Sequence, residues 1–332
     1  MANVAINGFG RIGRAVFKLL ADTSGLNVVA INDLVPPENL AYLLQYDTVY
    51  GRYPHVVQVE GNALAVNGKS YKLLGEHNPV QLPWQDLNVD IVFECTGVFN
   101  QRDDLQKHVQ AGAKYVLLSA PTKSEEVPTL VYGVNTTDGG TQIVSCASCT
   151  TNCITPVVEV MGRRIGIKKA IMTTVHAYTA TQSVVDSPNK KTRRGRAAAA
   201  NLVPSSTGAA LATTKALPQY EGKFDGVAVR APVPVGSLAD IVFVTKRPTT
   251  ESEVNAIFTE EATSERYRGI LGVTTDPIVS SDVIRQPYAS IVDLDLTQVV
   301  DGDLVKVMSW YDNEWGYAAQ MVREAQRLVR EG

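Results

Sequence analysis

Three of the four cysteines in this 332-residue chain lie within ten positions, in the stretch VSCASCTTNC at residues 144–153. Such a cluster could hold a metal ion, form a redox pair, or supply one nucleophile beside two structural thiols. Zinc sites commonly take four ligands as two separated pairs, and the sequence has no second C-x-x-C. Cys146 and Cys149 have the spacing of a redox pair, but the thioredoxin-like βαβ context is missing. We therefore expect no metal site, and we favour a single nucleophile.

Cys149 is the candidate for that nucleophile. The strand-like run QIVSCAS at 142–148 gives way to a helical pattern from about Cys149, and Ser148 is a natural N-cap. A thiol in the first helical turn lies near the positive end of the helix dipole, which favours its thiolate. Cys153, one turn further along, and Cys95, on a predicted strand, are expected to be small buried side chains.

A nucleophilic thiolate needs a base, and His176 is the candidate among the four histidines. It ends the strongly β run IMTTVHAYT just before a polar loop, whereas His55, His77 and His108 lie in polar surroundings and look like surface residues. An imidazole beside Cys149 would form a thiolate–imidazolium pair and then move a proton. The residues alone leave open whether the two side chains meet, because a single histidine at a strand end is more often structural.

The N-terminal glycines predict a second site, for a dinucleotide. Gly8, Gly10 and Gly13 form G-x-G-x-x-G between a predicted strand, NVAIN, and a predicted helix. The first glycine permits a tight turn, the second lets a pyrophosphate approach the backbone, and the third brings helix and strand together. The N–H groups at the helix start would bind the phosphates. Asp33, 20 residues after Gly13, would bind the adenosine ribose hydroxyls and repel a 2′-phosphate, which favours NAD over NADP.

The elements that must position these residues fall into two groups. Apolar strand-like runs alternate with helical patterns in the first half, at 3–7, 26–33, 89–99, 113–121, 129–135 and 142–148, with a helical stretch near 102–112. This alternation predicts an α/β, Rossmann-type doubly wound parallel sheet. Longer strands with fewer helices between them predict an α+β catalytic domain with a mixed or antiparallel sheet, from the runs at 168–179, 226–235, 238–248 and 289–314.

Two further helices complete the predicted organisation. One is expected at 250–264, and the other at the C-terminus, where apolar residues follow helical spacing. The NAD-binding domain is expected to comprise 1–148 and 313–332, and the catalytic domain 149–312.

Composition excludes some classes of protein. A net charge of −3 gives no general attraction to nucleic acid, and without an apolar run of 18 residues no membrane helix is expected. The basic stretch at 190–196 is interpreted as a solvated loop. Four cysteines in so long a chain do not make a disulfide framework, so a reducing, cytoplasmic location is expected.

The chain also carries longer motifs: INGFGRIGR at 6–14, SCTTNC at 148–153, HAYTATQ at 176–182, RRGRAAAANLVPSSTGAA at 193–210, VAVRAP at 227–232 and WYDNEWGY at 310–317. Together they resemble the phosphorylating, NAD-dependent glyceraldehyde-3-phosphate dehydrogenase family over nearly the entire chain, and SCTTNC is highly specific to that family and its closest relatives. The resemblance implies that Cys149 attacks the aldehyde of glyceraldehyde 3-phosphate and that His176 accepts the hydroxyl proton as hydride leaves for NAD. Inorganic phosphate then cleaves the thioester to 1,3-bisphosphoglycerate. A homotetramer is also implied.

The same resemblance implies two anion sites and a set of cofactor contacts. The substrate phosphate is expected at Thr179, Thr181 and Arg230. The attacking phosphate is expected at Ser148, Thr150, Thr207, Gly208 and Arg194, although Thr207 could be a simple N-cap. Hydroxyls, backbone N–H groups and guanidinium groups all donate to phosphate. Expected cofactor contacts are Gly8, Phe9, Gly10, Arg11, Ile12, Gly13, Asp33, Thr96, Gly97, Ser119, Asn313 and Tyr317.

Two positions depart from the family pattern. Cys146 stands where the family more commonly has Asn, which suggests a disulfide with Cys149 under mild oxidation. Ser187-Pro188 stands where NAD-specific members tend to carry Leu-Pro, so weak use of NADP is expected beside NAD. The rival interpretations are an erythrose-4-phosphate dehydrogenase and, in another class, a regulatory protein that binds NAD or RNA. The motifs HAYTATQ and VPSSTGAA favour the triose enzyme.

Overall fold

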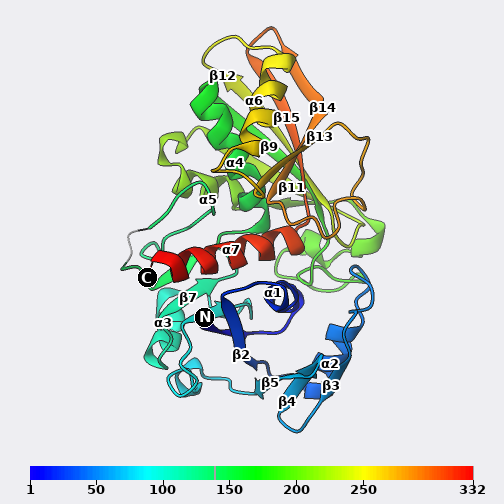
Figure 1. The fold of residues 1–332 in the computed structure, drawn as a ribbon. Coiled ribbons are helices and arrows are strands. Elements are labelled where there is room, and N and C mark those ends of the chain that lie inside the picture. Colours follow the sequence, from blue (N-terminus) through cyan, green and yellow to red (C-terminus); the bar gives the residue numbers. More distant parts are fainter. Residues whose placement is uncertain (138–139, 332) are drawn as a thin grey trace. The chain divides into compact units, whose positions relative to one another are not determined.

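The structure is a computed structural model that describes residues 1–137 and 140–331 (Figure 1). The chain divides into two compact units. The first comprises Met1–Leu130, Thr137–Ala147 and Met321–Gly332, and the second comprises Val131–Thr136 and Ser148–Gln320. Compared with the predicted domains, the segments 131–136 and 313–320 group with the second unit.

The first unit is built on an eight-stranded sheet. Its strands are β1 (Ala2–Asn7), β2 (Leu26–Asn32), β3 (Val57–Val59), β4 (Ala63–Val66), β5 (Lys69–Leu74), β6 (Ile91–Glu94), β7 (Tyr115–Leu118) and β8 (Ile143–Ser145). Its helices are α1 (Arg11–Ala21), α2 (Pro37–Gln45), the 3-10 helix η1 (Pro79–Gln81) and α3 (Arg102–Gln110). The strand order is β3-β4-β5-β2-β1-β6-β7-β8.

The predicted doubly wound parallel sheet is confirmed in the six strands from β5 to β8, which pair in parallel. The strands β3 and β4 form an antiparallel edge that was not predicted. Asn67 and Gly68, with φ of 51° and 78°, make the two-residue turn between β4 and β5. Asn-Gly favours such a hairpin turn because both central residues need positive φ. The strand order reverses beside β1, where a doubly wound sheet binds its ligands.

The prediction of a strand at 129–135 is wrong. Only Thr129 forms an isolated bridge, to Ser145, and residues 132–134 form a turn. Asn135 closes that turn, because its side chain accepts a hydrogen bond from the backbone N–H of Val131 and its own N–H donates to the Val131 carbonyl. Leu130 and Val131 are nevertheless buried, which explains why the segment has an apolar, strand-like sequence.

The second unit is built on a seven-stranded mixed sheet, as predicted. Its strands are β9 (Ile167–Ala177), β10 (Val203–Ser206), β11 (Phe224–Ala231), β12 (Ser237–Thr245), β13 (Leu271–Thr274), β14 (Ser290–Val300) and β15 (Leu304–Tyr311), in the order β10-β11-β9-β12-β15-β14-β13. Its helices are α4 (Cys149–Arg164), η2 (Thr192–Gly195), η3 (Ala198–Ala200), α5 (Ala209–Ala216), η4 (Pro218–Tyr220), α6 (Glu251–Thr263) and the first residues of α7 (Trp315–Glu331).

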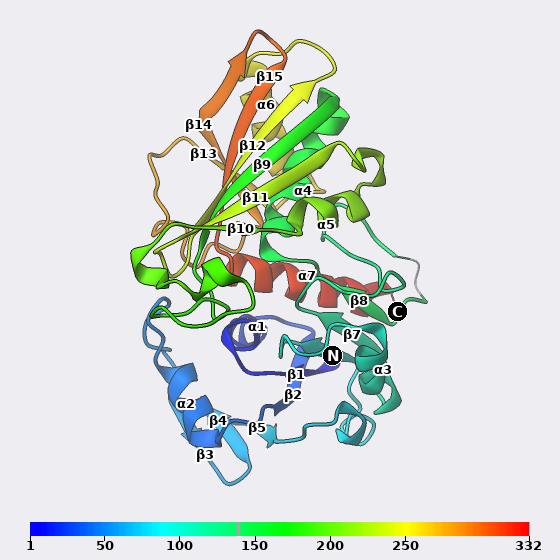
Figure 2. The ribbon, with the colours of Figure 1, turned by 180° about the vertical axis from the view of Figure 1, so that it is seen from behind.

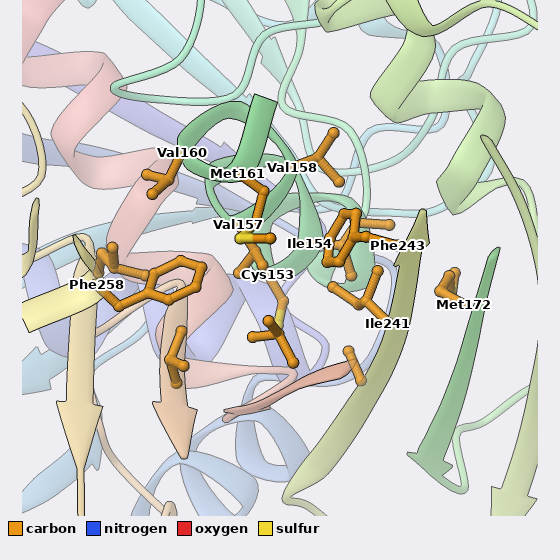
Figure 3. Close-up of a cluster of buried hydrophobic side chains, with 14 of the residues drawn as sticks. Cys153, Ile154, Val157, Val158, Val160, Met161, Met172, Ile241, Phe243 and Phe258 are labelled. Carbon is orange, nitrogen blue, oxygen red and sulfur yellow. The ribbon is translucent and has the colours of Figure 1, made fainter. Parts of the chain in front are cut away.

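One face of this sheet carries the core of the unit. Helix α4 packs on β9, β12, β14 and β15, and α6 packs on β13 and β14 (Figure 1). Side chains of α4 lie among Phe258 of α6 and Ile241 and Phe243 of β12, and Cys153 lies in the middle of this cluster (Figure 3). The opposite face of the sheet is seen in Figure 2 without α4 or α6 over it. Packing in this core thus fixes the position of α4, and with it Cys149, relative to the strands of the sheet.

Candidate active site

Cys149 is the first residue of α4, as predicted, and Ser148 caps the helix. The Ser148 hydroxyl accepts a hydrogen bond of 3.1 Å from the backbone N–H of Thr151. A serine cap of this kind stabilises a helix by about 1 kcal/mol relative to alanine. Ala147, just before the cap, has a φ of 58°, so the chain turns sharply from β8 into the helix. The sulfur therefore lies at the helix start, beside backbone N–H groups of Cys149 and Thr150 that favour its anion.

His176 lies within reach of that sulfur, so the structure brings the two predicted residues together. Its Nε2 atom is 3.4 Å from Sγ of Cys149. The histidine occupies the penultimate position of β9 and is 4% exposed. The ring of Tyr311 packs edge-on against the imidazole, with 5.9 Å between the ring centroids. The Tyr311 hydroxyl lies 2.9 Å from the hydroxyl of Thr150 and 2.9 Å from that of Thr174. These hydroxyl contacts connect α4, β9 and β15 next to Cys149 and His176.

Burial acts on the charge of each member of the pair. It raises the pKa of the Cys149 thiol, although the Arg230 charge and hydrogen bonds from Thr150 act in the opposite direction. Burial and the Arg230 charge lower the pKa of His176 to about 3. Burial thus favours the neutral form of each group taken alone, whereas Arg230 favours the thiolate. The thiolate–imidazolium pair stays a prediction.

Arg230 contacts the far side of the imidazole. One of its Nη atoms lies 2.7 Å from Nδ1 of His176 and donates to the Ala177 carbonyl at 2.8 Å. Nδ1 is also 2.7 Å from that carbonyl. A guanidinium only donates and a carbonyl only accepts, so the two contacts of Nδ1 select different tautomers. A bare Nε2, ready to take a proton from Cys149, requires the tautomer whose Nδ1–H faces Ala177.

Some of the residues predicted for the two separate anion sites contact one another. Thr179 and Thr181 have hydroxyls 3.0 Å apart, and Arg194 donates to the Thr181 hydroxyl at 3.2 Å. Arg194 also donates to Ser205 at 2.9 Å. Arg194, predicted for the second site, thus contacts a residue predicted for the first. Hydroxyls and a guanidinium gathered in this way are suited to bind a phosphate.

Three of the remaining anion candidates already have intramolecular roles. The Ser148 hydroxyl caps α4, and the buried Thr150 hydroxyl faces Tyr311. The Thr207 hydroxyl accepts from the backbone N–H of Ala209 in the turn before α5. The N-cap of α5 is Gly208, so the capping alternative considered for Thr207 is wrong. Gly208, by contrast, is exposed at the start of α5.

A cavity of about 480 Å³ opens where the strand order of the first sheet reverses. Of the predicted cofactor contacts, Gly8, Gly10, Asp33 and Thr96 line it. The other lining residues are Asn7, Asn32, Leu34, Glu76, His77, Cys95, Val98 and Phe99. Most of them follow the carboxyl ends of β1, β2 and β6, which is where a doubly wound sheet binds a nucleotide.

The three glycines fit a dinucleotide-binding turn. A Cβ on Gly8, whose φ is +90°, would lie 2.6 Å from the backbone nitrogen of Thr96. A Cβ on Gly13 would lie 2.1 Å from the Gly8 carbonyl oxygen. Only glycine therefore lets α1 approach β1 and β6 so closely. Gly10 has open space at this position, so a phosphate could approach its backbone.

The other predicted cofactor residues are placed as follows. Phe9 is buried, and its N–H donates to the Asp33 carboxylate at 2.6 Å, which fixes that acid. Arg11 pairs with Asp47 at 2.6 Å. Ile12 and Ser119 are half-buried, and Gly97 is exposed with a φ of +72°. In the second unit, Tyr317 is buried, and the Oδ1 atom of Asn313 accepts hydrogen bonds from Ser237 at 3.0 Å and from Gly236.

Some residues near these sites were missed in the sequence. Asn7 and Asn32 are the last residues of β1 and β2 and line the cavity, and polar residues at parallel strand ends are a usable signal. Ser237 is fully buried and bonds both the N–H of Ala177 and the side chain of Asn313. The prediction that His108 lies on the surface is wrong. It is fully buried, with hydrogen bonds to the side chains of Trp84 and Glu94.

The remaining cysteines are consistent with structural roles. Cys153 is fully buried, with Ser290 and Ser309 beside its sulfur. Burial raises the pKa of Cys146 well above its ordinary value and also raises the pKa of Cys95. A thiol with a raised pKa reacts slowly at neutral pH. Disulfide formation by Cys146 stays a prediction.

Two family models match the chain. The model of the glyceraldehyde 3-phosphate dehydrogenase NAD-binding domain matches residues 2–102, and the model of the C-terminal domain of the same enzymes matches residues 148–313. The chain belongs to the glyceraldehyde-3-phosphate dehydrogenase family. It is therefore an oxidoreductase, and its cofactor is NAD.

Curated relatives of the same name cover almost the whole chain. The chain is 48% identical to the glyceraldehyde-3-phosphate dehydrogenase of Streptomyces coelicolor over 323 residues, which is 96% of each protein. It is 47% identical to that of Haloarcula vallismortis over 330 residues, 98% of each, and 46% identical to that of Clostridium acetobutylicum over 330 residues, 97% of each. The sequence resemblance to this family is confirmed.

The described residues contain neither a metal-binding cluster nor a membrane-spanning helix. Among residues 1–137 and 140–331, no three metal-ligating side chains gather where they could hold an ion. Within the same ranges no helix has both the length and the apolar character needed to cross a membrane.

Proposed function

We propose that this protein oxidises glyceraldehyde 3-phosphate with NAD and inorganic phosphate to 1,3-bisphosphoglycerate. The 3.4 Å approach of Cys149 Sγ to His176 Nε2 at a helix start carries the proposal. In the first step the sulfur attacks the aldehyde carbon and His176 takes the thiol proton. The N–H of Cys149 stabilises the developing oxyanion, which becomes the hydroxyl of a hemithioacetal.

The later steps use the same two residues. NAD, when bound, supplies the hydride acceptor. His176, neutral again, takes the hydroxyl proton as the carbon on Cys149 becomes a thioester. A phosphate oxygen then attacks the thioester carbon, the carbon–sulfur bond breaks, and Cys149 leaves as a thiolate that recovers its proton from His176. Covalent capture makes the oxidation effectively unimolecular and retains its energy in the thioester.

Arg230 is proposed to couple substrate binding to the histidine tautomer. In the structure its guanidinium contacts Nδ1 of His176 and the Ala177 carbonyl. A substrate phosphate bound by Arg230, Thr179 and Thr181 would draw the guanidinium away. Nδ1–H would then face the Ala177 carbonyl, and Nε2 would be left bare to accept a proton.

The cofactor is proposed to bind the cavity at the ends of β1, β2 and β6, with its pyrophosphate at Gly10 and its adenosine ribose at Asp33. The oriented Asp33 carboxylate supports NAD over NADP. The proposed role of Asn313, in the second unit, is to bind the nicotinamide carboxamide through its side-chain amide nitrogen, since Oδ1 is engaged with Ser237.

One assay tests the reaction and its rival. Formation of reduced cofactor is followed at 340 nm with glyceraldehyde 3-phosphate or erythrose 4-phosphate, with and without inorganic phosphate, and with NAD or NADP. We expect turnover of the triose with NAD that depends on phosphate or arsenate. Phosphate-independent turnover of the tetrose would instead identify an erythrose-4-phosphate dehydrogenase. No turnover with either aldehyde would favour a regulatory protein.

A homotetramer is also proposed, in a cytoplasmic location. The open face of the second sheet supports assembly, because apolar side chains in register lie exposed on it: Ile171 and Val175 of β9, Val227 of β11 and Leu304 of β15. Exposed apolar patches commonly mark protein interfaces. Sedimentation velocity should show a tetramer, and Ile171→Asp should shift it toward smaller species. A wild-type monomer would contradict the proposal.

A further inference from the structure

A chain of buried polar side chains lies behind the proposed cofactor cavity. Trp84, Glu94 and His108 are each 0% exposed. Within the described part of the chain, the hydrogen-bond partners of Glu94 are Asn7, Thr96 and His108, with no Lys or Arg among them. Burying a carboxylate away from a cation is costly unless several donors satisfy its oxygens. Such a cluster therefore calls for a physical reason.

The hydrogen bonds fix the tautomer of His108. The indole nitrogen of Trp84 lies 3.0 Å from its Nδ1 atom. An indole N–H only donates, so Nδ1 carries no proton and accepts this bond. The single ring proton of the neutral imidazole is then on Nε2, which lies 3.1 Å from Oε2 of Glu94. A proton on Nδ1 would face the Trp84 N–H, so the contacts select the tautomer of His108 that donates from Nε2.

Glu94 links His108 to residues that line the cavity through hydrogen bonds. Its Oε2 atom also accepts from the side-chain amide of Asn7 at 2.6 Å. Its Oε1 atom accepts from the backbone N–H of Thr96 at 2.8 Å and from the Thr96 hydroxyl at 2.5 Å. Asn7 in turn accepts from Asn32 at 2.7 Å. Asn7, Asn32 and Thr96 all line the cavity, so one carboxylate orients groups at the ends of β1, β2 and β6.

We propose that His108 is a positioning residue for the cofactor cavity. Trp84 fixes its tautomer, the Nε2–H orients Glu94, and Glu94 holds Asn7 and the turn at Thr96 in the geometry that binds NAD. His108 does not touch the cofactor. The inference rests on the proposal that NAD occupies this cavity. It assigns a role to His108, which is separated from the cavity by Glu94.

Titration calorimetry with NAD tests this role against simple folding support. A glutamine side chain carries a donor and an acceptor, so it can donate to Glu94 as the Nε2–H of His108 does. Leucine can neither donate nor accept a hydrogen bond. We expect His108→Leu to weaken NAD binding about tenfold, in line with the loss of a hydrogen bond to a charged group. His108→Gln should stay within about twofold to threefold of the wild type, and kcat at saturating NAD should change little in both. The matched control is His55→Gln, a histidine outside the network that packs on Tyr53.

Nitrogen-15 NMR of histidine-labelled protein supplies a readout that does not depend on His108→Leu folding. The signals lost in His108→Gln assign the residue, and we expect one protonated Nε2 and one bare Nδ1. Trp84→Phe should relax this pattern and weaken NAD binding without lowering kcat. A proton on Nδ1 would overturn this inference but not the proposed cofactor site. Equal NAD affinity of His108→Leu and His108→Gln would do the same. A wild type that binds no NAD would overturn the proposed cofactor site and this inference with it.

Discussion

Cys149 Sγ and His176 Nε2 lie 3.4 Å apart, although 27 positions separate them in the chain. Cys149 starts a helix and His176 is the penultimate residue of a strand, and the packing of α4 on β9 sets their separation. Burial raises the pKa of the thiol and lowers the pKa of the imidazole, whereas the Arg230 charge favours the thiolate. At 3.4 Å the imidazole is close enough to take the thiol proton as the sulfur attacks.

Replacing the nucleophile should abolish turnover. We expect Cys149→Ala to lower kcat at least about a thousandfold in the 340 nm assay, because no covalent intermediate can form. Cys153→Ala is the matched control, since it removes a neighbouring thiol from the core and should affect stability rather than kcat. Comparable rates in Cys149→Ala and the wild type would refute the assignment.

The lowered pKa of His176 makes stability depend on pH. Its folded pKa of about 3 lies below the ordinary value of 6.5, so the unfolded chain binds a proton more readily. This contribution to stability is present above pH 6.5 and is lost as the pH falls toward 3, by on the order of 1 kcal/mol per pH unit. Thermal unfolding at pH 7 and pH 5 should show a larger drop in Tm for the wild type than for His176→Gln. Equal drops would count against a neutral buried imidazole.

The assignment of Arg194 to the attacking phosphate can be tested by kinetics. Its guanidinium donates to Thr181 and Ser205, and it is half-buried. We expect Arg194→Ala to raise the KM for inorganic phosphate about tenfold to a hundredfold, as loss of a charge-assisted hydrogen bond implies. Arg196→Ala removes an exposed charge from the same loop, where it pairs with Asp186, and should leave that KM unchanged. An increase confined to the KM for the aldehyde would place Arg194 at the substrate phosphate instead.

Cofactor choice should depend on Asp33. We expect Asp33→Ala to weaken NAD binding about tenfold or more, because two ribose hydroxyls lose their acceptor and the N–H of Phe9 loses its partner. NADP binding should weaken less or improve, since the repulsion of a 2′-phosphate is removed. Calorimetry with both cofactors measures this ratio, with Asp86→Ala as an exposed acidic control. An unchanged ratio would show that another group sets the preference.

The sequence supported the predictions that depend on local patterns. Alternating strands and helices indicated the parallel sheet, and the position of Cys149 after a capping serine indicated its helix start. The antiparallel edge was also within reach, because Asn67-Gly68 between two apolar runs is a strong hairpin signal.

The errors come from tertiary contacts that no local pattern contains. Residues 129–135 look like a strand because Leu130 and Val131 are buried, yet Asn135 folds the segment into a turn. His108 has polar neighbours in sequence because α3 is amphipathic, and its buried face meets a carboxylate and an indole from distant segments. The pKa shifts of Cys149 and His176 likewise follow from burial, which only the folded structure reveals.

The hydroxyl contacts of Tyr311 with Thr150 and Thr174 limit how this enzyme could be redesigned. Apolar burial is not directional, but the bonds from the buried phenol fix Thr150, and with it the neighbouring Cys149, at one height above the strands. Larger side chains in the core beneath α4 would move the helix and break the bonds of Tyr311 with Thr150 and Thr174. Variation in chain length or side-chain size at 179–196 is therefore the more promising route to new substrates.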